Sequence, residues 1–243
     1  MTIRGKAREG LSASFDGKER IVKLHRPLAL VLMLVSWNTE ASIAGELSIG
    51  AKAGLITTSV TGVPKEWEDS KSYRTSFVGG MFLNYAIDDA FSLQPELLYV
   101  PKGVTGNLYD GFISVDVTPS FEFLELPILA KYTFPTGGNW HPCVFAGPSF
   151  AYALSSKLKI SAGWLATSVD ISSLTNDTEF GIVAGTGFDY ETGRGVLTFD
   201  VRYERGLTNI IKSGEVEFLG STQTISIDEF KNYGFAFLVG YQF

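Results

Sequence analysis

The chain has 243 residues, of which 45% are hydrophobic and 13% are aromatic, and its formal net charge is −6. This acidic balance argues against a nucleic-acid-binding protein, which usually carries a basic patch. The single cysteine, Cys143, excludes an internal disulfide and a zinc site built from cysteines. No run of 18 apolar residues occurs, yet the mean hydropathy is +0.13. That combination indicates apolar residues spread over short strands.

The first 44 residues have the order of a secretory signal. A basic stretch at 18–26 precedes an apolar run at 27–37, and small residues, Ser42 and Ala44, stand before a cleavage point at Gly45. The alternative is that the apolar run forms a buried helix.

We therefore predict an N-terminal extension and signal peptide at 1–44, followed by one β-barrel domain at 45–243. The basic stretch begins late for a signal, which suggests a true translation start near Ile21 or Val22 as one hypothesis.

Eight segments after residue 45 alternate large apolar residues with small or polar ones. A period of two is typical of β-strands, and about ten residues suffice for a tilted strand to cross a bilayer. The predicted strands are 47–57, 77–87, 91–101, 124–134, 144–154, 180–190, 197–205 and 233–243. No stretch shows a convincing period of 3.6, so we expect helices to be minor.

The connections between these segments alternate strictly in length. Short ones lie at 88–90, 135–142 and 191–196, and long ones lie at about 58–76, 103–123, 155–179 and 206–229. Outer-membrane barrels have short periplasmic turns and long extracellular loops. The pattern predicts an all-β fold: an eight-stranded antiparallel up-and-down transmembrane β-barrel with short periplasmic turns and four long extracellular loops.

Alternation alone does not say which face is outside, because a soluble lipocalin-like barrel has the same period. The glycine-rich face is the narrow one, which suits the interior of a small barrel. That face also carries charges of both signs, which are tolerable inside only when paired. The predicted interior charge network is Lys52, Glu96, Lys102, Glu125, Lys131, Asp200, Arg202 and Glu204.

Aromatic residues gather near the strand ends of the apolar face. This placement fits the aromatic girdles at the two membrane interfaces, although aromatic residues also favour strands in general. The predicted girdle residues are Tyr85, Phe91, Tyr99, Tyr132, Phe134, Phe188, Tyr190, Tyr203, Tyr241 and Phe243.

Several stretches resemble the small porin-like outer-membrane family known as the outer membrane protein β-barrel domain. They are FSLQPELLYVPKG at 91–103, FLELPILAKYTF at 123–134, CVFAGPSFAYAL at 143–154, RYERGLTNI at 202–210 and the closing YGFAFLVGYQF. The resemblance covers most of 45–243. It implies a barrel similar to OmpX and the OmpA transmembrane domain, exported through the periplasm to the outer membrane of a Gram-negative bacterium. The family has no agreed biochemical activity.

The resemblance also gives the last strand a second role. Its ending looks like the signal by which the barrel-assembly machinery recognises its clients, carried here by Phe237, Val239, Tyr241 and Phe243.

The sequence provides no evident catalytic site. The mature chain has one histidine, His141, in a predicted periplasmic turn. The possible carboxylate pairs, Asp200 with Glu204 and Glu96 with Glu125, are explained more simply as interior ion pairs than as acid–base catalysts. Acidic residues in the loops lack the ligand spacing of a calcium site, so no metal and no cofactor are expected.

We expect a non-enzymatic integral outer-membrane barrel with a structural or loop-mediated surface-interaction role. The alternatives are a narrow porin-like channel for small solutes or ions and, less favoured, a lipid-modifying outer-membrane enzyme. The expected partners are outer-membrane lipid and lipopolysaccharide, with the barrel-assembly machinery during insertion and no nucleic acid.

Overall fold

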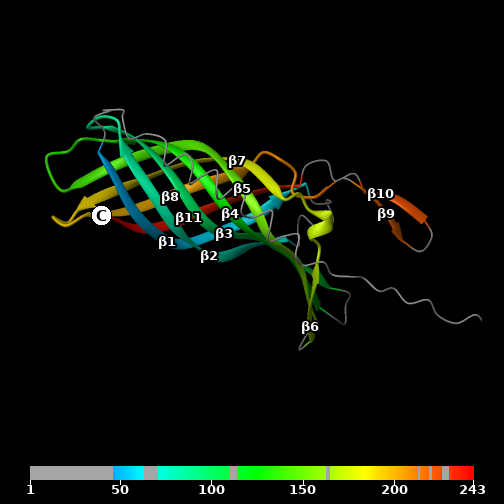
Figure 1. Cartoon of the computed structure of the whole chain (residues 1–243). Coiled ribbons are helices and arrows are strands. Elements are labelled where there is room, and N and C mark those ends of the chain that lie inside the picture. The colour runs from blue at the N-terminus through cyan, green and yellow to red at the C-terminus, as the bar shows by residue number, and fades with distance from the viewer. Residues whose placement is uncertain are drawn as a thin grey trace, which may run out of the picture. The chain divides into compact units, whose positions relative to one another are not determined.

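The computed structural model describes residues 46–62, 71–109, 114–162, 165–212, 214–218, 221–225 and 230–243 (Figure 1). The predicted signal peptide at 1–44 lies outside these residues. The elements are β1 (Leu47–Thr61), β2 (Lys71–Ala86), β3 (Phe91–Tyr109), β4 (Ser114–Thr133), β5 (Trp140–Ala162), β6 (Leu165–Asp170), η1 (Ser172–Leu174), β7 (Thr178–Glu191), β8 (Val196–Gly206), β9 (Gly214–Phe218), β10 (Ser221–Ile225) and β11 (Lys231–Gln242).

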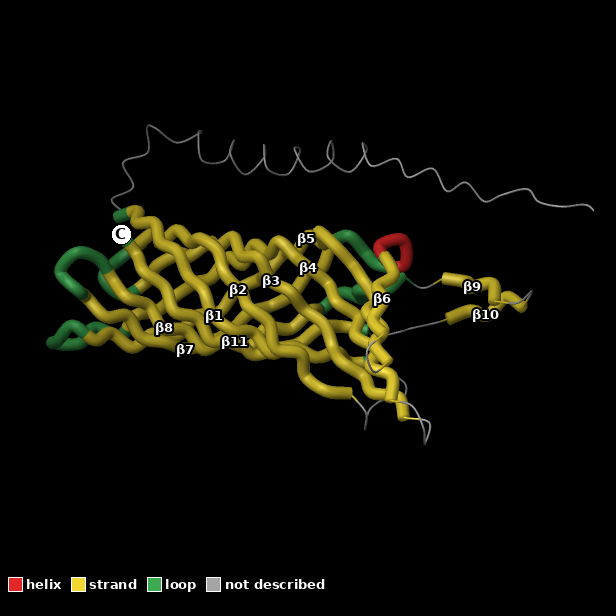
Figure 2. The backbone as a smooth tube through the Cα atoms, turned by 90° about the horizontal axis from the view of Figure 1, so that it is seen from below, coloured by secondary structure: helices red, strands yellow, loops and turns green. Residues whose placement is uncertain are grey.

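Eight of these strands close into an antiparallel barrel in the order β1, β2, β3, β4, β5, β7, β8 and β11. The ring closes where β11 pairs with β1, from Gly50 opposite Gln242 to Thr61 opposite Lys231. The crossing of tilted strands is visible in Figure 2. Closure leaves the eight strands without a free edge in the membrane, where unpaired backbone groups cost several kcal/mol each. The predicted fold class is confirmed.

All eight predicted strands are present, but the prediction of their length was wrong at the end that carries the long connections. β3, β4 and β5 contain 19, 20 and 23 residues instead of about ten. Much of the predicted loops at 103–123 and 155–179 is therefore strand. β6 pairs with the C-terminal end of β5, from Lys157 opposite Asp170 to Ala162 opposite Leu165. These polar segments keep the strand period beyond the apolar band, since antiparallel sheets can face water.

The opposite end has tight turns. In the turn after β2, the carboxylate of Asp88 accepts hydrogen bonds from the backbone N–H of Ala90 at 2.8 Å and of Phe91 at 2.7 Å. In the turn after β7, Gly193 has a φ of +78°, a left-handed conformation that glycine adopts without steric cost. Both chain ends of the barrel lie on this side, as an even number of antiparallel strands requires.

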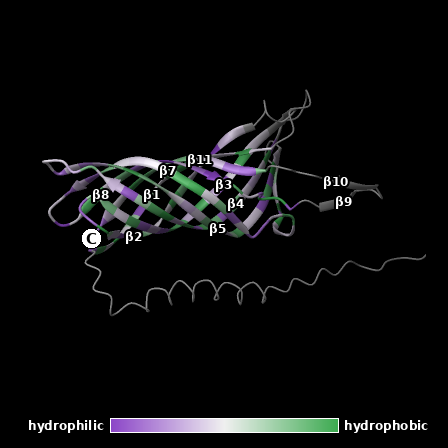
Figure 3. Ribbon diagram, turned by 90° about the horizontal axis from the view of Figure 1, so that it is seen from above, coloured by the Kyte–Doolittle hydropathy of each residue, from purple (hydrophilic) through white to green (hydrophobic). Residues whose placement is uncertain are grey.

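The outer surface of the barrel is an apolar band. Large side chains such as Phe77, Ile182, Val201 and Phe237 are exposed there, between 46% and 80% of their surface. Figure 3 shows green, hydrophobic segments along the middle of the strands. A soluble barrel would bury these groups, so the faces are assigned as the sequence predicted, with the apolar face outside.

Rings touch one another near the turn side of the band. Trp140 contacts Phe188 and Tyr190 with ring centroids 5.1 and 4.6 Å apart, and Tyr132 contacts Phe91 at 4.8 Å. Near the other rim, the Tyr73 and Tyr233 rings are 6.1 Å apart. These contacts form the two girdles typical of outer-membrane barrels.

The loop side of the barrel carries a short ordered cap, formed by residues 171–176 and 209–212. The backbone N–H of Asn176 donates to Ile210 O at 2.7 Å, and that of Lys212 donates to Leu174 O at 2.9 Å. The side chain of Ile210 is 1% exposed. In the described part of the chain, no helix has the length and apolar character needed to cross a membrane.

Candidate functional site in the barrel interior

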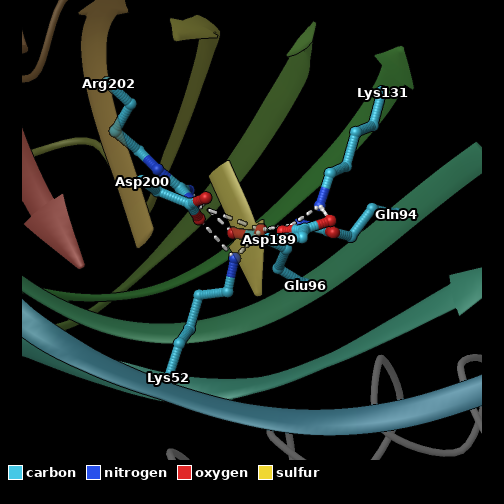
Figure 4. Close-up of polar contacts among 7 residues, drawn as sticks. All are labelled: Lys52, Gln94, Glu96, Lys131, Asp189, Asp200 and Arg202. Carbon is cyan, nitrogen blue, oxygen red and sulfur yellow. Dashed lines mark hydrogen bonds and ion pairs between the residues drawn. The ribbon is translucent and has the colours of Figure 1, made fainter. Parts of the chain in front are cut away.

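Strand alternation places a set of charged side chains inside the barrel. The first group, here called the balanced cluster, consists of Lys52, Glu96, Asp200 and Arg202 (Figure 4). Their side chains are at most 3% exposed. Two cations meet two anions, so the cluster is neutral without any further ion.

In the balanced cluster, each of the two cations contacts both carboxylates. Lys52 Nζ donates to Glu96 Oε1 at 2.8 Å and to Asp200 Oδ2 at 2.7 Å. Arg202 donates to both oxygens of Glu96, at 2.7 and 3.2 Å, and to Asp200 Oδ2 at 3.0 Å. The two-pronged Arg–carboxylate arrangement is among the strongest polar contacts in proteins. Gln94 adds a hydrogen bond from Nε2 to Glu96 Oε1 at 2.7 Å.

Aromatic rings support the two cations of this cluster. Lys52 Nζ lies 4.5 Å from the centroid of the Phe82 ring, and the Arg202 guanidinium lies 5.4 Å from that of Phe145. Such rings attract cations through the negative charge density on their faces. Glycines make room for them, because a Cβ at Gly50 would collide with Phe82 and a Cβ at Gly185 would lie 2.6 Å from Phe145.

A separate pair lies nearer the turns. Lys131 Nζ donates to the two oxygens of Asp189 at 3.0 and 2.7 Å. Asp189 lines a cavity of about 220 Å³ at the turn end, which also involves Asp89, His141, Glu191 and Gln242. A second cavity of about 400 Å³ shares Glu191 and Gln242 with it. The barrel is therefore hollow at its turn end.

The second group, here called the acidic cluster, consists of Lys102, Glu125, Glu179 and Glu204. Lys102 Nζ is 2.7 Å from Glu125 Oε2, 3.5 Å from Glu179 Oε1 and 4.0 Å from Glu204 Oε2. Three carboxylates therefore share one ammonium group, and each of the four side chains is at most 5% exposed. Buried ions of one sign repel each other strongly in a low dielectric.

The acidic cluster is also incompletely hydrogen-bonded. Asn232 Nδ2 donates to Glu179 Oε2 at 2.8 Å. Asn232 Oδ1 and both carboxylate oxygens of Glu204 receive no hydrogen bond. A cavity of about 10 Å³, lined by Glu204 and Asn232 among others, lies beside them and has room for about one water molecule.

Apolar layers separate and cover the two clusters. Between them, except at β8, where Arg202 and Glu204 are consecutive inward residues, lie Ile56, Val78, Leu98, Val100, Ala236 and Leu238, each at most 3% exposed. On the loop side of the acidic cluster lie Val60, Val104, Phe121, Phe123, Ala151, Ile210 and Phe230. These side chains fill the interior from the balanced cluster to the cap, as is usual for an eight-stranded barrel.

The structure places all eight charged residues named from the sequence inside the barrel and divides them between the two clusters and the Lys131–Asp189 pair. The predicted network omitted Gln94, Glu179, Asp189 and Asn232, although the period of two puts Gln94 and Asp189 on the same face of their strands as the network. Glu179 fell in a predicted loop, because the strand that became β7 was expected to begin at Phe180. The odd-numbered inward positions of β7 run from Glu179 to Asp189, so extending the predicted strand by one residue before Phe180 identifies Glu179 as an inward residue.

The two hypothetical carboxylate pairs are separated. Glu96 belongs to the balanced cluster and Glu125 to the acidic one. Asp200 and Glu204 are divided in the same way, with Arg202 between them on β8. Each of these carboxylates has a cation within 4.0 Å, which agrees with the ion-pair interpretation.

His141 lies at the turn end, with Nε2 3.3 Å from Glu191 Oε1 and Nδ1 3.3 Å from the Thr136 hydroxyl. It belongs to the cavity that opens on the turn side. Among the described residues, no three His, Cys, Asp or Glu side chains are grouped so that they could hold a metal ion.

The residues of the predicted C-terminal assembly signal face outward. Phe237 and Val239 are 52% and 38% exposed, and the Tyr241 and Phe243 rings are 5.0 Å apart. Their alternation follows directly from the pairing of β11 with β1 and β8.

Comparison with known protein families and with solved structures finds proteins similar to this chain. A family model described as outer membrane protein beta-barrel domain matches residues 37–212. Solved structures similar to this chain include OprG of Pseudomonas aeruginosa, at 12% identity over 82% of this chain and 97% of OprG, with a TM-score of 0.45. The outer membrane protein W of E. coli is 17% identical over 81% of this chain and 97% of its own, with a TM-score of 0.36. Ail of Yersinia pestis is 13% identical over 82% and 99%, with a TM-score of 0.37. A search of curated proteins found no match.

Proposed function

Since the chain belongs to the outer membrane protein beta-barrel domain family and lies in the bacterial outer membrane, we propose that it is a non-enzymatic, non-conducting barrel that carries an extracellular β-sheet for contacts at the cell surface. The filled interior is the observation that carries this proposal. Two charged clusters and two apolar layers follow one another along the barrel axis, and the cap of residues 171–176 and 209–212 covers the loop end.

A narrow porin-like channel is the competing function. Ions crossing this barrel would have to pass the apolar layer around Leu98 and Val100, whose side chains are fully buried among their neighbours. They would also have to break the hydrogen bonds of Arg202 and Lys52. A hydrophobic constriction without water is a barrier to ions.

Planar-bilayer recordings with the purified, refolded protein at graded salt test this choice. We expect no steady single-channel steps from the wild type. A variant with Leu98→Ser and Val100→Ser, which opens the apolar layer while leaving both clusters intact, is expected to raise the conductance. Regular steps from the wild type, absent from a heat-unfolded sample, would establish the channel instead.

The loop side offers a surface for contacts. β3, β4 and β5 continue beyond the apolar band, and β6 adds an exposed strand whose described side chains, from Ala166 to Asp170, all face solvent at least in part. In the described part of the chain β6 pairs with β5 alone, so its other edge presents backbone donors and acceptors. Such an edge can accept an extended strand of another protein.

Removal of the hairpin at 157–170 tests the surface role. Bacteria producing this variant should adhere less to protein-coated surfaces than bacteria producing equal amounts of the wild type. Exchange of the periplasmic turn at 135–139 for another turn of equal length is the control and should leave adhesion unchanged. Equal adhesion of all three strains would contradict the proposal.

For assembly, we propose that Phe237, Val239, Tyr241 and Phe243 are the residues that the barrel-assembly machinery recognises. Their outward alternation on the last strand supports this proposal. Deletion of Phe243 should slow insertion into membranes that contain the machinery and leave the urea stability of the finished barrel nearly unchanged. If the deletion lowered the insertion rate and the urea stability to the same degree, the proposed recognition role would be contradicted.

A further inference from the structure

The acidic cluster borders a small cavity where β8 pairs with β11. Two inward positions of these strands are glycines, Gly206 and Gly234, and Gly234 lies opposite Glu204. The cavity of about 10 Å³ is lined by Thr58, Lys102, Glu204, Gly206, Asn232, Tyr233 and Gly234. A Cβ at Gly206 would lie only 2.5 Å from Glu179 Oε1. Because the two glycines carry no side chain, a space of the size of one water molecule stays open inside the barrel.

The polar groups around this cavity present oxygen atoms that lack a donor. Asn232 is 2% exposed, and its Nδ2 donates to Glu179 Oε2 at 2.8 Å, so its Oδ1 is directed away from that carboxylate. Neither this Oδ1 nor either carboxylate oxygen of Glu204, which is 4% exposed, receives a hydrogen bond from the described residues. Leaving buried acceptors unsatisfied is costly, and a ligand in the cavity would remove that cost.

The one ammonium group of the acidic cluster leaves its charge unbalanced. Lys102 Nζ lies 2.7 Å from Glu125 Oε2 but 4.0 Å from Glu204 Oε2, so its closest contact is with Glu125. Three carboxylates against one ammonium leave two negative charges in excess. Like charges repel strongly where the dielectric constant is low, and a second cation beside Glu204 would reduce this repulsion.

We propose that one sodium ion binds in this cavity, with the Glu204 carboxylate and Asn232 Oδ1 as its protein ligands. Hard cations take oxygen ligands, and oxygens are the free polar atoms on these walls. Ca²⁺ takes about six to eight oxygens and Mg²⁺ usually keeps several of its waters, which exceeds both the ligands and the room present. A water molecule would fit the space but would leave both excess charges. A singly charged ion of similar size answers both deficits.

Urea unfolding of the barrel in vesicles of a zwitterionic lipid tests this inference, because an ion that binds only the folded state stabilises it by mass action. Sodium chloride replaces choline chloride at constant ionic strength, and the choline ion is too large for the cavity. For one bound ion, each tenfold rise in sodium above the dissociation constant should raise the folding equilibrium constant about tenfold. Equal urea midpoints in sodium and in choline would overturn the inference, whatever the variants do.

Two variants remove the proposed ligands, and one matched variant removes a carboxylate elsewhere. The stability of Glu204→Gln and of Asn232→Ala should respond little to sodium. In choline, Glu204→Gln should be more stable than the wild type, since one excess charge is gone, and this advantage should shrink as sodium rises. Glu96→Gln in the balanced cluster is the control, and its stability should rise with sodium as steeply as that of the wild type. A wild-type sodium response in Glu204→Gln would contradict the assigned ligand.

Potassium and pH distinguish sodium from other ligands. Potassium is larger and should stabilise the wild type less than sodium does; equal effects of the two ions would overturn a site fitted to sodium. If the wild type gained stability between pH 8 and pH 6 and ignored sodium, a proton would take the place of the ion and the inference would fail. The bilayer recordings measure conduction and not this equilibrium, so this inference and the proposed function fail or hold separately.

Discussion

The balanced and acidic clusters lie in the same barrel, are buried to the same extent, and differ in how their charges are matched. In the balanced cluster, two cations and two anions are joined by hydrogen bonds of 2.7 to 3.2 Å. In the acidic cluster, one ammonium serves three carboxylates at 2.7, 3.5 and 4.0 Å. Removing one charge from the first therefore creates an imbalance, whereas removing a carboxylate from the second reduces one.

The largest expected effect is from Arg202→Met, after which Lys52 is the only cation among the described residues within 4.0 Å of Glu96 and Asp200. Removing one partner from a buried ionic group costs about 3–5 kcal/mol of unfolding free energy. Urea titration of the barrel in lipid vesicles, followed by tryptophan fluorescence, measures this cost. A loss below 1 kcal/mol would mean that water reaches the balanced cluster.

A single charge introduced on the lipid-facing surface, where it has no partner, can be compared with the charges of the two buried clusters. Ile128 faces outward on β4, four residues before the girdle residue Tyr132, and Ile128→Arg should cost about 2–4 kcal/mol if this level is the bilayer midplane. Phe134→Arg, on the same face at the turn end, should cost only about 0–1 kcal/mol from its charge. The same urea titration measures both, and equal costs would contradict the assigned membrane band.

Glu204→Gln should have a smaller effect of the opposite sign. The substitution removes one excess negative charge, and an amide at this position can donate a hydrogen bond to the unsatisfied Asn232 Oδ1. We expect the free energy of unfolding to rise by about 1 kcal/mol. Glu96→Gln is the matched substitution in the balanced cluster and should lower it. If both variants lost stability equally, the charge imbalance of the acidic cluster would have no energetic consequence.

The smallest effect is expected outside the membrane, at the Asp88 turn. The backbone N–H groups of Ala90 and Phe91 donate to its carboxylate and lower the pKa of Asp88 below its ordinary value. A lowered folded-state pKa adds stability above the unfolded-state value and loses it as pH falls through the folded-state value. Asp88→Asn should therefore lose a little stability at pH 6 and should match the wild type near pH 2. Urea titrations at the two pH values compare them.

The period of two in the sequence was sufficient to predict all eight barrel strands, their order and the face that meets lipid, because each property depends on residues of one strand or its immediate neighbours. The extent of the strands was not predictable in the same way. In the stretch at 155–162, Leu158, Ile160 and Ala162 do alternate with polar residues, but this alternation is short and is followed by a largely polar segment, so the sequence predicts a loop there. Pairing with β4 makes the stretch part of β5.

The sequence by itself determined that Lys52, Glu96, Asp200 and Arg202 face the interior. Only the tertiary structure decided which of them meet, since Lys52 and Asp200 are 148 residues apart and their contact depends on how strands are staggered around the ring. The register of β3 with β4, which sets Leu98 opposite Glu125, likewise places Glu96 and Glu125 in different layers. Whether a side chain points into the barrel depends only on its position in the strand. Its height along the barrel axis depends on how the strands pair around the closed barrel.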